Sequence, residues 1–272
     1  MPRADAHDPS DWRALNHAWW EERAPLHEQS VFYRSGGGGL EEFEWNDLGS
    51  VEGLDVFHPQ CHIGTDTLSL AERGARVVGL DFSANATAAA ARLAEAAGLG
   101  ERVEWVTGDA YDSVEAVGGR NFDLVYTGKG ALCWLPDMAR WAAVMWKLCR
   151  PGGLLYVSEF HPVQDMLEVD TTEFERDYFP VGGDVYDDGS GSYAEPDAAT
   201  VNNVTVDFIH PLSEVTQHLL DAGFRLELMR EFPFTVYRRW PFLEEREQGV
   251  FCMPDDRPQL PLMYSLRLRR PA

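Results

Sequence analysis

The sequence predicts an α/β protein in which helices cover both faces of a mainly parallel sheet. Short apolar segments typical of buried strands alternate along the chain with segments of helical periodicity, as in parallel strands joined by helical crossovers. Residues 55–81 show the pattern in its shortest form, with a strand, a tight turn, a helix and a second strand. A carboxylate closes that second strand, and open α/β sheets bind ligands beyond the carboxyl ends of their strands. The pattern therefore predicts a ligand site at this edge of the sheet.

The N-terminal segment is expected to be helical from Asp11 to Phe32, with Pro25 ending its first part. Three tryptophans lie on its apolar side (Trp12, Trp19 and Trp20). Aromatic side chains usually serve burial, so packing onto the sheet is preferred for Trp12 and Trp19 over a role in covering a ligand. Residues 35–39, SGGGG, are expected to form a flexible loop and a hinge.

The segment 55–81 reads DVFHPQCHIGTDTLSLAERGARVVGLD. A dinucleotide-binding turn needs glycines so that the backbone can approach a pyrophosphate. Here Gln60 and His62 stand at such positions, and only Gly64 remains, so a pyrophosphate ligand is disfavoured. Asp81 is well placed to accept hydrogen bonds from both hydroxyls of a ribose. The segment is interpreted as half of a nucleoside-binding, Rossmann-like unit.

The remaining elements follow from apolar periodicity and from breakers. Ser83 or Asn85 caps the next helix. The acidic, aromatic segment 165–203 is long and irregular, as lids and binding loops are. The expected strands are 102–106, 122–127, 153–160, 204–209, 224–230 and 262–269, the expected helices are 83–97, 113–117, 135–150 and one from residue 213, and residues 232–261 form an aromatic, proline-rich crossover.

Charge and composition exclude several classes of function. The formal net charge of −22 disfavours a nucleic-acid partner, which needs a basic face to displace counterions. The 272 residues contain no apolar segment as long as a membrane span and no signal peptide at the N-terminus, so no membrane partner and a cytoplasmic location are expected. The four cysteines lack zinc-site spacing, so buried thiols and no metal site are expected (Cys61, Cys133, Cys149 and Cys252).

The string QCHIGTDTLSLAERGARVVGLDFS resembles the first two motifs of class I S-adenosylmethionine-dependent methyltransferases. It is most similar to a bacterial branch whose first motif has a Q-C-H-x-G form. The helix, PGG and strand at 135–160 add to the resemblance. The resemblance implies a doubly wound, seven-stranded sheet of order 3-2-1-4-5-7-6, with the last strand antiparallel. It also implies one domain over residues 1–272, with an N-terminal cap (1–40), a cofactor-binding core (41–160), an inserted lid (161–210) and a C-terminal helix with strands 6 and 7 (211–272).

The same resemblance implies S-adenosyl-L-methionine as the cofactor and assigns residues to its parts. The N-terminal cap would cover the methionine end, with Trp20, Arg23, His27 and Tyr33 as candidates. The first motif would supply Gln60, Cys61, His62 and Gly64. The ribose would lie at Asp81, Phe82 and Ser83, the adenine at Gly108, Asp109 and Ala110, and the transferable methyl group near Thr127, Gly128 and Lys129. A solvated loop lysine is an equal interpretation of Lys129, and a helix cap is a compatible one for Asp109.

Methyl transfer to oxygen or nitrogen of a small-molecule acceptor is the preferred function. Holding the reactants together supplies most of the rate in such reactions. A histidine titrates near neutrality, so His161 is the first candidate for a general base and His210 the second, against the more common structural role of each. The aromatic residues of the lid and crossover suggest an aromatic or apolar acceptor. The alternatives are a peptide acceptor, a non-catalytic nucleoside-binding module and, disfavoured by the missing glycines, a nicotinamide oxidoreductase; the acceptor and the oligomeric state stay open.

Overall fold

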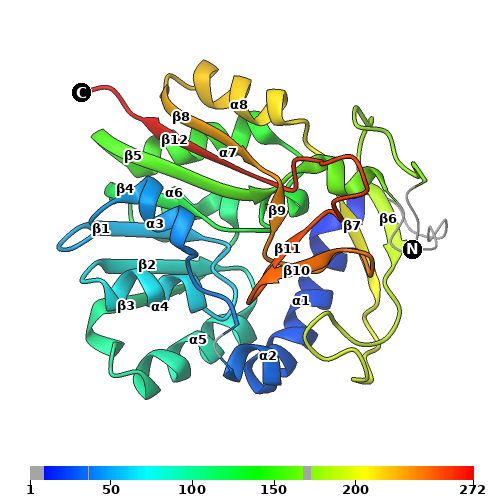
Figure 1. Ribbon diagram of the computed structural model, residues 1–272. Helices are drawn as coiled ribbons and strands as arrows, with labels where there is room; N and C mark the ends of the chain where they lie inside the picture. The colour runs from blue at the N-terminus through cyan, green and yellow to red at the C-terminus, as the bar shows by residue number, and fades with distance from the viewer. Residues whose placement is uncertain (1–8, 36, 168–172) are drawn as a thin grey trace.

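The structure, a computed structural model, describes residues 9–35, 37–167 and 173–272. Its main feature is a seven-stranded sheet (Figure 1). Its order is β3-β2-β1-β4-β5-β12-β8. β12 is antiparallel to both neighbours, and the other pairs are parallel. The expected order, with the final strand of the chain inserted antiparallel, is confirmed. The strands are β1 (Asp55–Pro59), β2 (Arg76–Asp81), β3 (Val103–Thr107), β4 (Phe122–Thr127), β5 (Cys149–Phe160), β8 (Arg225–Phe232) and β12 (Met263–Arg269).

Helices cover both faces of the sheet because successive strand residues point to opposite faces and both sets are apolar. Phe57, Val125 and Leu155 share a core with α7 and α8, whereas Val56 and Leu124 share a second core with α3 and α4. Burying one such side chain stabilises the fold by about 1.5–3 kcal/mol. The helices are α1 (Trp12–Gln29), α2 (Val31–Arg34), α3 (Glu42–Leu48), α4 (Thr65–Glu72), α5 (Ala84–Ala96), α6 (Ser113–Ala116), α7 (Met138–Leu148) and α8 (Leu212–Asp221).

Helix α1 continues through Pro25, so the expectation that this proline ends the first helical segment is wrong. A proline within a helix lacks the N–H that would bond the carbonyl four residues earlier, here that of Glu21. The Glu21 carbonyl instead accepts a hydrogen bond from Nδ2 of Asn85, on α5, at 3.0 Å. Packing between two helices therefore supplies the partner that the proline cannot.

Helix α7 begins at Met138, three residues after the expected start. Asp137 is its cap and accepts a hydrogen bond from the backbone N–H of Arg140 at 2.8 Å. The preceding residues form a 3₁₀ turn, Leu132–Trp134. Ser83 caps α5 as expected, through a hydrogen bond from the Ala86 backbone.

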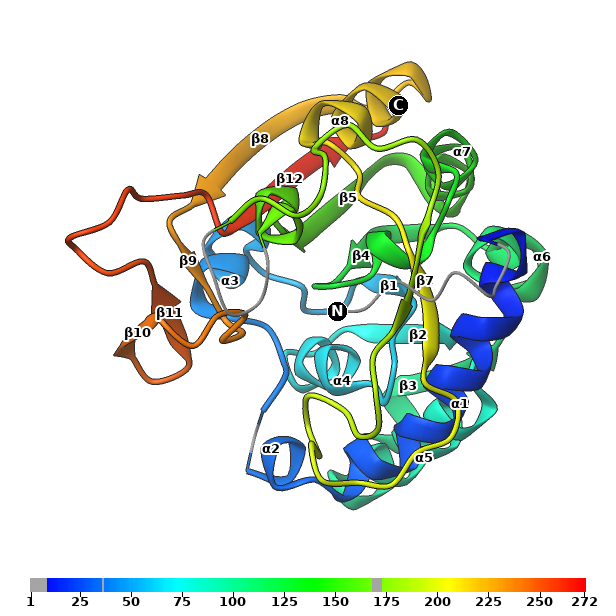
Figure 2. The same ribbon diagram turned by 90° about the vertical axis from the view of Figure 1, so that its right-hand side faces the viewer.

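The inserted segment after β5 carries a hairpin of β6 (Asp184–Asp187) and β7 (Val204–Asp207), paired antiparallel. β7 lies alongside α1 (Figure 2). The side-chain amide of Asn16, on α1, donates to the Val206 carbonyl at 2.7 Å and accepts from the Val206 N–H at 2.8 Å. The hairpin and α1 therefore form one layer at the end of the sheet.

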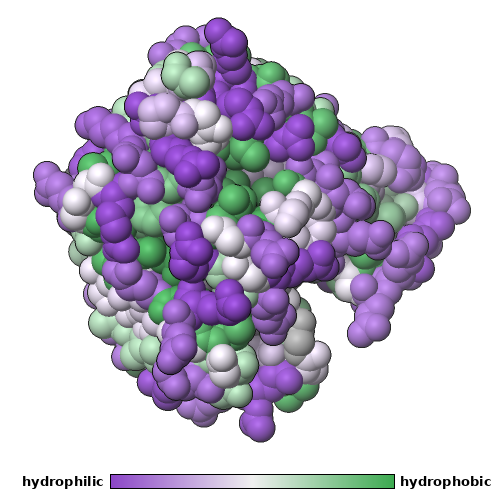
Figure 3. Space-filling view, turned by 90° about the vertical axis from the view of Figure 1, so that its left-hand side faces the viewer, coloured by the Kyte–Doolittle hydropathy of each residue, from purple (hydrophilic) through white to green (hydrophobic). Residues whose placement is uncertain are grey.

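The crossover expected over residues 232–261 contains a small sheet that apolar periodicity does not predict. Its strands are β9 (Phe234–Thr235), β11 (Val250–Cys252) and β10 (Glu244–Glu247), and all four residues of β10 are exposed. The segment projects from the body as a lobe with a mainly hydrophilic surface (Figure 3). Within the described ranges, no helix has the length and apolar character of a membrane span.

Candidate functional site

The turn after β1 is built from residues in the left-handed backbone conformation. Gln60 has a φ of 53° and His62 a φ of 51°, and Gly64 follows with a φ of 82°. Side chains tolerate this region at a cost of roughly 1–2 kcal/mol per residue. The His62 N–H donates to Oδ2 of Asp81 at 2.8 Å, and this bond helps to hold the turn. The turn thus has the left-handed backbone conformation that glycines usually adopt, although Gln60 and His62 both carry side chains.

Asp81 closes β2 and is 6 % exposed. Its Oδ2 accepts the His62 N–H, and its Oδ1 accepts the Ser83 N–H at 2.9 Å. Burial raises the pKa of the Asp81 carboxyl to about 6, although the two backbone donors favour its charged form. Each carboxylate oxygen has a second lone pair, so Asp81 can accept two further hydrogen bonds.

Asp109 lies beside Asp81 at the same edge of the sheet. β2 and β3 are parallel, with Asp81 opposite Thr107, and the Gly108 N–H donates to the Asp81 carbonyl at 2.9 Å. The Asp109 carboxylate accepts the Tyr111 N–H at 2.8 Å as the cap of a 3₁₀ turn and pairs with Nε of Arg13 at 2.9 Å. Both carboxylates line one cavity.

This cavity has a volume of about 660 Å³ and lies between the strand ends, α1 and the inserted segment. That size suits a ligand site for small molecules. Eleven of the residues implied by the sequence line it: Trp20, Tyr33, Gln60, Cys61, His62, Asp81, Phe82, Asp109, Ala110, Gly128 and Lys129. The residues that the resemblance assigns to the cofactor are thus brought together around one cavity, and their role in binding it stays a prediction.

Four other implied residues do not line the cavity. Gly64 packs against Trp105, where a Cβ would collide with the ring. Ser83 caps α5 and donates to Oε2 of Glu21 at 2.5 Å. Gly108 and Thr127 lie in the sheet edge behind the wall, with Thr127 fully buried. These residues support the cavity from outside it.

Lys129 is a buried ion-pair partner, so its interpretation as a solvated loop lysine is wrong. Its Nζ lies 2.7 Å from Oε2 of Glu44, which is fully buried, and 3.9 Å from Oδ2 of Asp66. Tyr126 donates its hydroxyl to Glu44 at 2.9 Å. Burial alone lowers the pKa of Lys129, but Asp66 and Glu44 outweigh it, and the pKa is raised. The network joins α3 to α4 and to the turn after β4.

His27 and His62 form a pair in which His62 lines the cavity and His27 lies behind it. Nδ1 of His27 lies 2.7 Å from Nε2 of His62, so one ring donates and the other accepts. Burial lowers the pKa of His27 to about 4, and both rings are therefore neutral near pH 7. Trp20 and Tyr33 pack against His62, with ring centroids 5.0 and 5.8 Å away. His27 supports this aromatic wall and is not part of the cavity lining.

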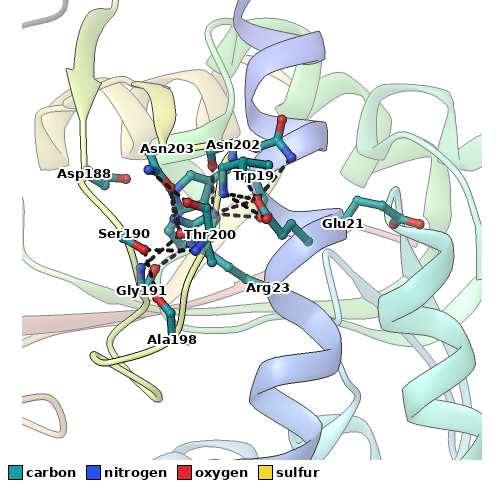
Figure 4. A network of polar contacts seen from close by, with 12 residues as sticks. Trp19, Glu21, Arg23, Asp188, Ser190, Gly191, Ala198, Thr200, Asn202 and Asn203 are labelled. Carbon is teal, nitrogen blue, oxygen red and sulfur yellow. Dashed lines mark hydrogen bonds and ion pairs between the residues drawn. The ribbon is translucent and has the colours of Figure 1, made fainter.

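Arg23 does not line the cavity, which corrects its expected role over a ligand; its side chain lies among residues of the inserted segment (Figure 4). It is fully buried, and its guanidinium donates to the carbonyls of Gly191 at 2.9 Å and Asn202 at 2.7 Å. Further donors reach the side chains of Thr200 and Asn203. Removing such a group leaves buried acceptors without partners. Arg23 therefore clasps the loop between β6 and β7 to α1.

The two candidate bases have both ring nitrogens engaged. His161 does not line the cavity; its Nδ1 accepts the Val163 N–H at 3.2 Å, and its Nε2 lies 3.0 Å from Glu231. His210 does line the cavity, but its Nε2 lies 2.7 Å from the Leu135 carbonyl and its Nδ1 lies 3.3 Å from Glu214. The structure thus places His161 away from the position expected for a base, because it caps a turn.

Glu159 is a cavity residue that the sequence reasoning missed. Its oxygens accept four backbone N–H groups, from Gly130, Ala131, Leu132 and Phe160, at 2.6–2.9 Å. Burial raises the pKa of Glu159 to about 7. The signal was an acidic residue inside the apolar strand GLLYVSEF. Its function in the fold is to hold the turn after β4.

Metal ligation is not supported by the geometry of this site. The described part of the chain has no group of three or more His, Cys, Asp or Glu residues arranged to hold a metal ion. His58, which lines the cavity, bonds Thr67 at 2.9 Å instead.

Comparison with known proteins identifies the type of domain. Residues 56–153 match the family model described as a methyltransferase domain. A ubiquinone biosynthesis O-methyltransferase of Leptothrix cholodnii is 26% identical over 193 residues, which are 68% of this chain and 77% of that protein. The trans-aconitate 2-methyltransferase of Deinococcus radiodurans is 36% identical over 124 residues, 43% of each chain.

Solved structures share the fold. Magnesium protoporphyrin IX methyltransferase from Synechocystis, solved with bound SAH, superposes with a TM-score of 0.56 at 16% identity. The match covers 96% of this chain and 100% of that chain. This match shows that the two chains share a fold.

Proposed function

We propose that this chain, a class I S-adenosylmethionine-dependent methyltransferase by its matched domain and its fold, transfers the methyl group to oxygen or nitrogen of a small-molecule acceptor. One observation carries the proposal: Asp81 and Asp109 line the same 660 Å³ cavity at the carboxyl edge of the sheet. Proteins similar to this chain are named for ubiquinone biosynthesis and trans-aconitate, which are small-molecule chemistries.

The side chains fit the nucleoside part of the cofactor. Asp81 has two lone pairs for ribose hydroxyls, and Asp109 would accept from the adenine amino group, next to Ala110. Because the strand order is 3-2-1-4, a base at β3 and a ribose at β2 direct the methionine end toward β1 and β4. There the wall includes Gln60, Gly128 and Lys129.

The methionine end of the cofactor would meet a hydrogen-bond acceptor, Gln60, and a cation, Lys129. Gln60 donates its Nε2 to the Ala131 carbonyl at 2.8 Å, and its Oε1 is buried with no partner among the described residues. This oxygen suits the α-ammonium group of the cofactor. Lys129 suits the α-carboxylate, since it is a cation among the residues that line the cavity. Trp20 and Tyr33 would cover this end.

S-adenosylmethionine supplies an electrophilic methyl group when bound. The protein then needs to exclude water and to hold the acceptor in line with that group. Glu159 would help to position the acceptor, because it fixes the turn after β4. Arg23 would help to exclude water, because its hydrogen bonds hold the inserted segment over the cavity. Of the two candidate bases, His210 is the one that lines the cavity. Its Nε2–H donates to the Leu135 carbonyl, so a proton would have to be taken up at Nδ1, which faces Glu214.

Calorimetric titration separates this function from the alternatives. We expect S-adenosylmethionine and S-adenosylhomocysteine to bind with micromolar or tighter affinity and NAD not to bind. Transfer of radiolabelled methyl to an acceptor in a broad phenol, amine and carboxylic acid panel would complete the test. Binding of neither methionine nucleoside would refute the proposal. Binding without transfer to any acceptor, a peptide library included, would favour the non-catalytic module.

Cofactor binding should weaken as the pH falls through 6. Ribose hydroxyls donate to the charged Asp81, so the bound cofactor favours ionisation of a group whose pKa is about 6 in the free protein. Binding therefore releases protons near pH 6, and affinity should fall by up to about tenfold per pH unit below it, with a plateau above pH 7. Besides burial and the two backbone donors, Glu21 raises the pKa of Asp81 and His17 lowers it.

Titrations of S-adenosylhomocysteine between pH 5 and 8, in buffers of different ionisation enthalpy, would measure this proton release. Asp81→Asn should bind more weakly and with no proton release in this range. A wild-type affinity that is constant from pH 5 to 8 would contradict the assigned role. The stability of the free protein should depend on pH with the opposite sign. The pKa of Asp81 is higher in the folded than in the unfolded protein, so the free energy of unfolding falls as the pH rises from about 4 to 6.

A further inference from the structure

We infer that the acceptor carries a carboxylate, and that Arg239 recognises it. This inference rests on the proposed function and names the substrate class of the same cavity. It starts from a partly exposed guanidinium whose Nε is buried and has no hydrogen-bond partner among the described residues.

Arg239 lines the cavity from the loop between β9 and β10. Its Nε is buried and has no hydrogen-bond partner among the described residues. Its nearest charged neighbour is Asp165, whose oxygen lies 3.5 Å from Nη2, too far for a strong bond. A guanidinium offers five N–H donors, and its Nε and Nη2 edge matches the two oxygens of a carboxylate. Leaving the buried Nε unpaired is costly, so a ligand that accepts from Nε, and from Nη2 beside it, is favoured.

The second arginine of the cavity shows what a satisfied guanidinium looks like in this protein. Arg176 bonds Asp207 through both terminal nitrogens, at 3.0 and 3.1 Å, and bonds Asp184 through Nε at 3.2 Å. All three of its nitrogens have carboxylate partners. Arg239 has the same chemistry without those partners. The cavity therefore contains one arginine locked within the protein and one available to a ligand.

An aromatic surface connects Arg239 with the turn that would face the methyl group. The Phe160 ring packs beside Gly130, 3.5 Å from where a Cβ would lie. Tyr237, two residues before Arg239, has its ring 6.3 Å from that of Phe160. Both aromatic residues line the cavity. A flat or apolar acceptor would lie along these rings, with its carboxylate at Arg239 and its methylated atom at the other end.

Acid and amide pairs test this directly. The probes are 4-hydroxybenzoate, cinnamate and indole-3-acetate, and each is compared with its carboxamide. The affinity of every probe is measured on the protein saturated with S-adenosylhomocysteine. We expect at least one acid to bind about tenfold more tightly than its amide, since only the acid makes a charged, forked contact. Arg239→Gln should reduce that preference to within about threefold, and Arg239→Lys should keep part of it.

Arg246→Gln is the matched control, because Arg246 is an exposed arginine of the same lobe, paired with Glu244 and Asp255. It should keep the full preference for the acid. The inference is overturned if no acid is preferred over its amide, or if the preference survives in Arg239→Gln. It is also overturned if Arg239→Gln weakens S-adenosylhomocysteine binding tenfold, because Arg239 would then serve the cofactor. Failure of wild type to bind S-adenosylhomocysteine would refute the proposed function itself.

Discussion

Replacement of Asp81 by alanine is expected to weaken S-adenosylhomocysteine binding by about two to four orders of magnitude. Two hydrogen bonds from ribose hydroxyls to a charged, buried carboxylate contribute about 1.5–3 kcal/mol each. The change also removes the acceptor of the His62 and Ser83 N–H groups, so the turn after β1 loses the contact that holds it. Calorimetry on wild type and variant measures the loss.

Asp112→Ala is the control for this variant. Asp112 is an acid at the same edge of the sheet, but its side chain is 55% exposed and pairs with Arg140. It should bind the ligand as wild type does. Circular dichroism and thermal unfolding would show whether Asp81→Ala keeps its fold. A folded Asp81→Ala protein that binds within threefold of wild type would remove the ribose assignment.

Replacement of Lys129 by methionine is expected to lower the free energy of unfolding by about 3 kcal/mol. The change leaves Glu44 fully buried without its cation, and breaking one side of a buried ion pair costs about 3–5 kcal/mol. The lower end applies because Tyr126 and the Glu41 backbone still donate to Glu44. Urea unfolding of both proteins measures the difference.

The sequence contains a second lysine, the exposed Lys147, which makes a matched control. Lys147→Met should change stability by less than about 0.5 kcal/mol, as surface substitutions usually do. The double variant Glu44→Gln/Lys129→Met should recover part of the loss, because it removes the unpaired charge. If Lys129→Met is as stable as Lys147→Met, the pair has no stabilising role.

The sheet and its binding edge could be predicted because buried parallel strands leave a plain pattern. Strands such as FDLVYT are apolar throughout, and Asp81 and Asp109 follow the ends of two neighbouring strands. The antiparallel insertion of the final strand came from the family resemblance, and the pairing of β12 with β5 and β8 confirms it.

Other features depend on contacts between distant residues, which periodicity does not contain. Where helix α1 passes Pro25, Asn85 on another helix bonds the Glu21 carbonyl that the proline leaves without a donor. The position of His161 after β5 was predicted, but its orientation was not, since Glu231 on another strand holds the ring. Strand β10 consists of four exposed, charged residues, so apolar alternation does not predict this strand or the small sheet to which it belongs.

The backbone of Gln60 and His62 has a consequence for how such proteins are detected. Both residues adopt the dihedral region that is usually reserved for glycine. A pattern search that requires glycine at these positions would miss this loop, although its backbone has the left-handed dihedral angles that such loops need. Classifying nucleotide loops by torsion angle, and not by residue type, would recover it.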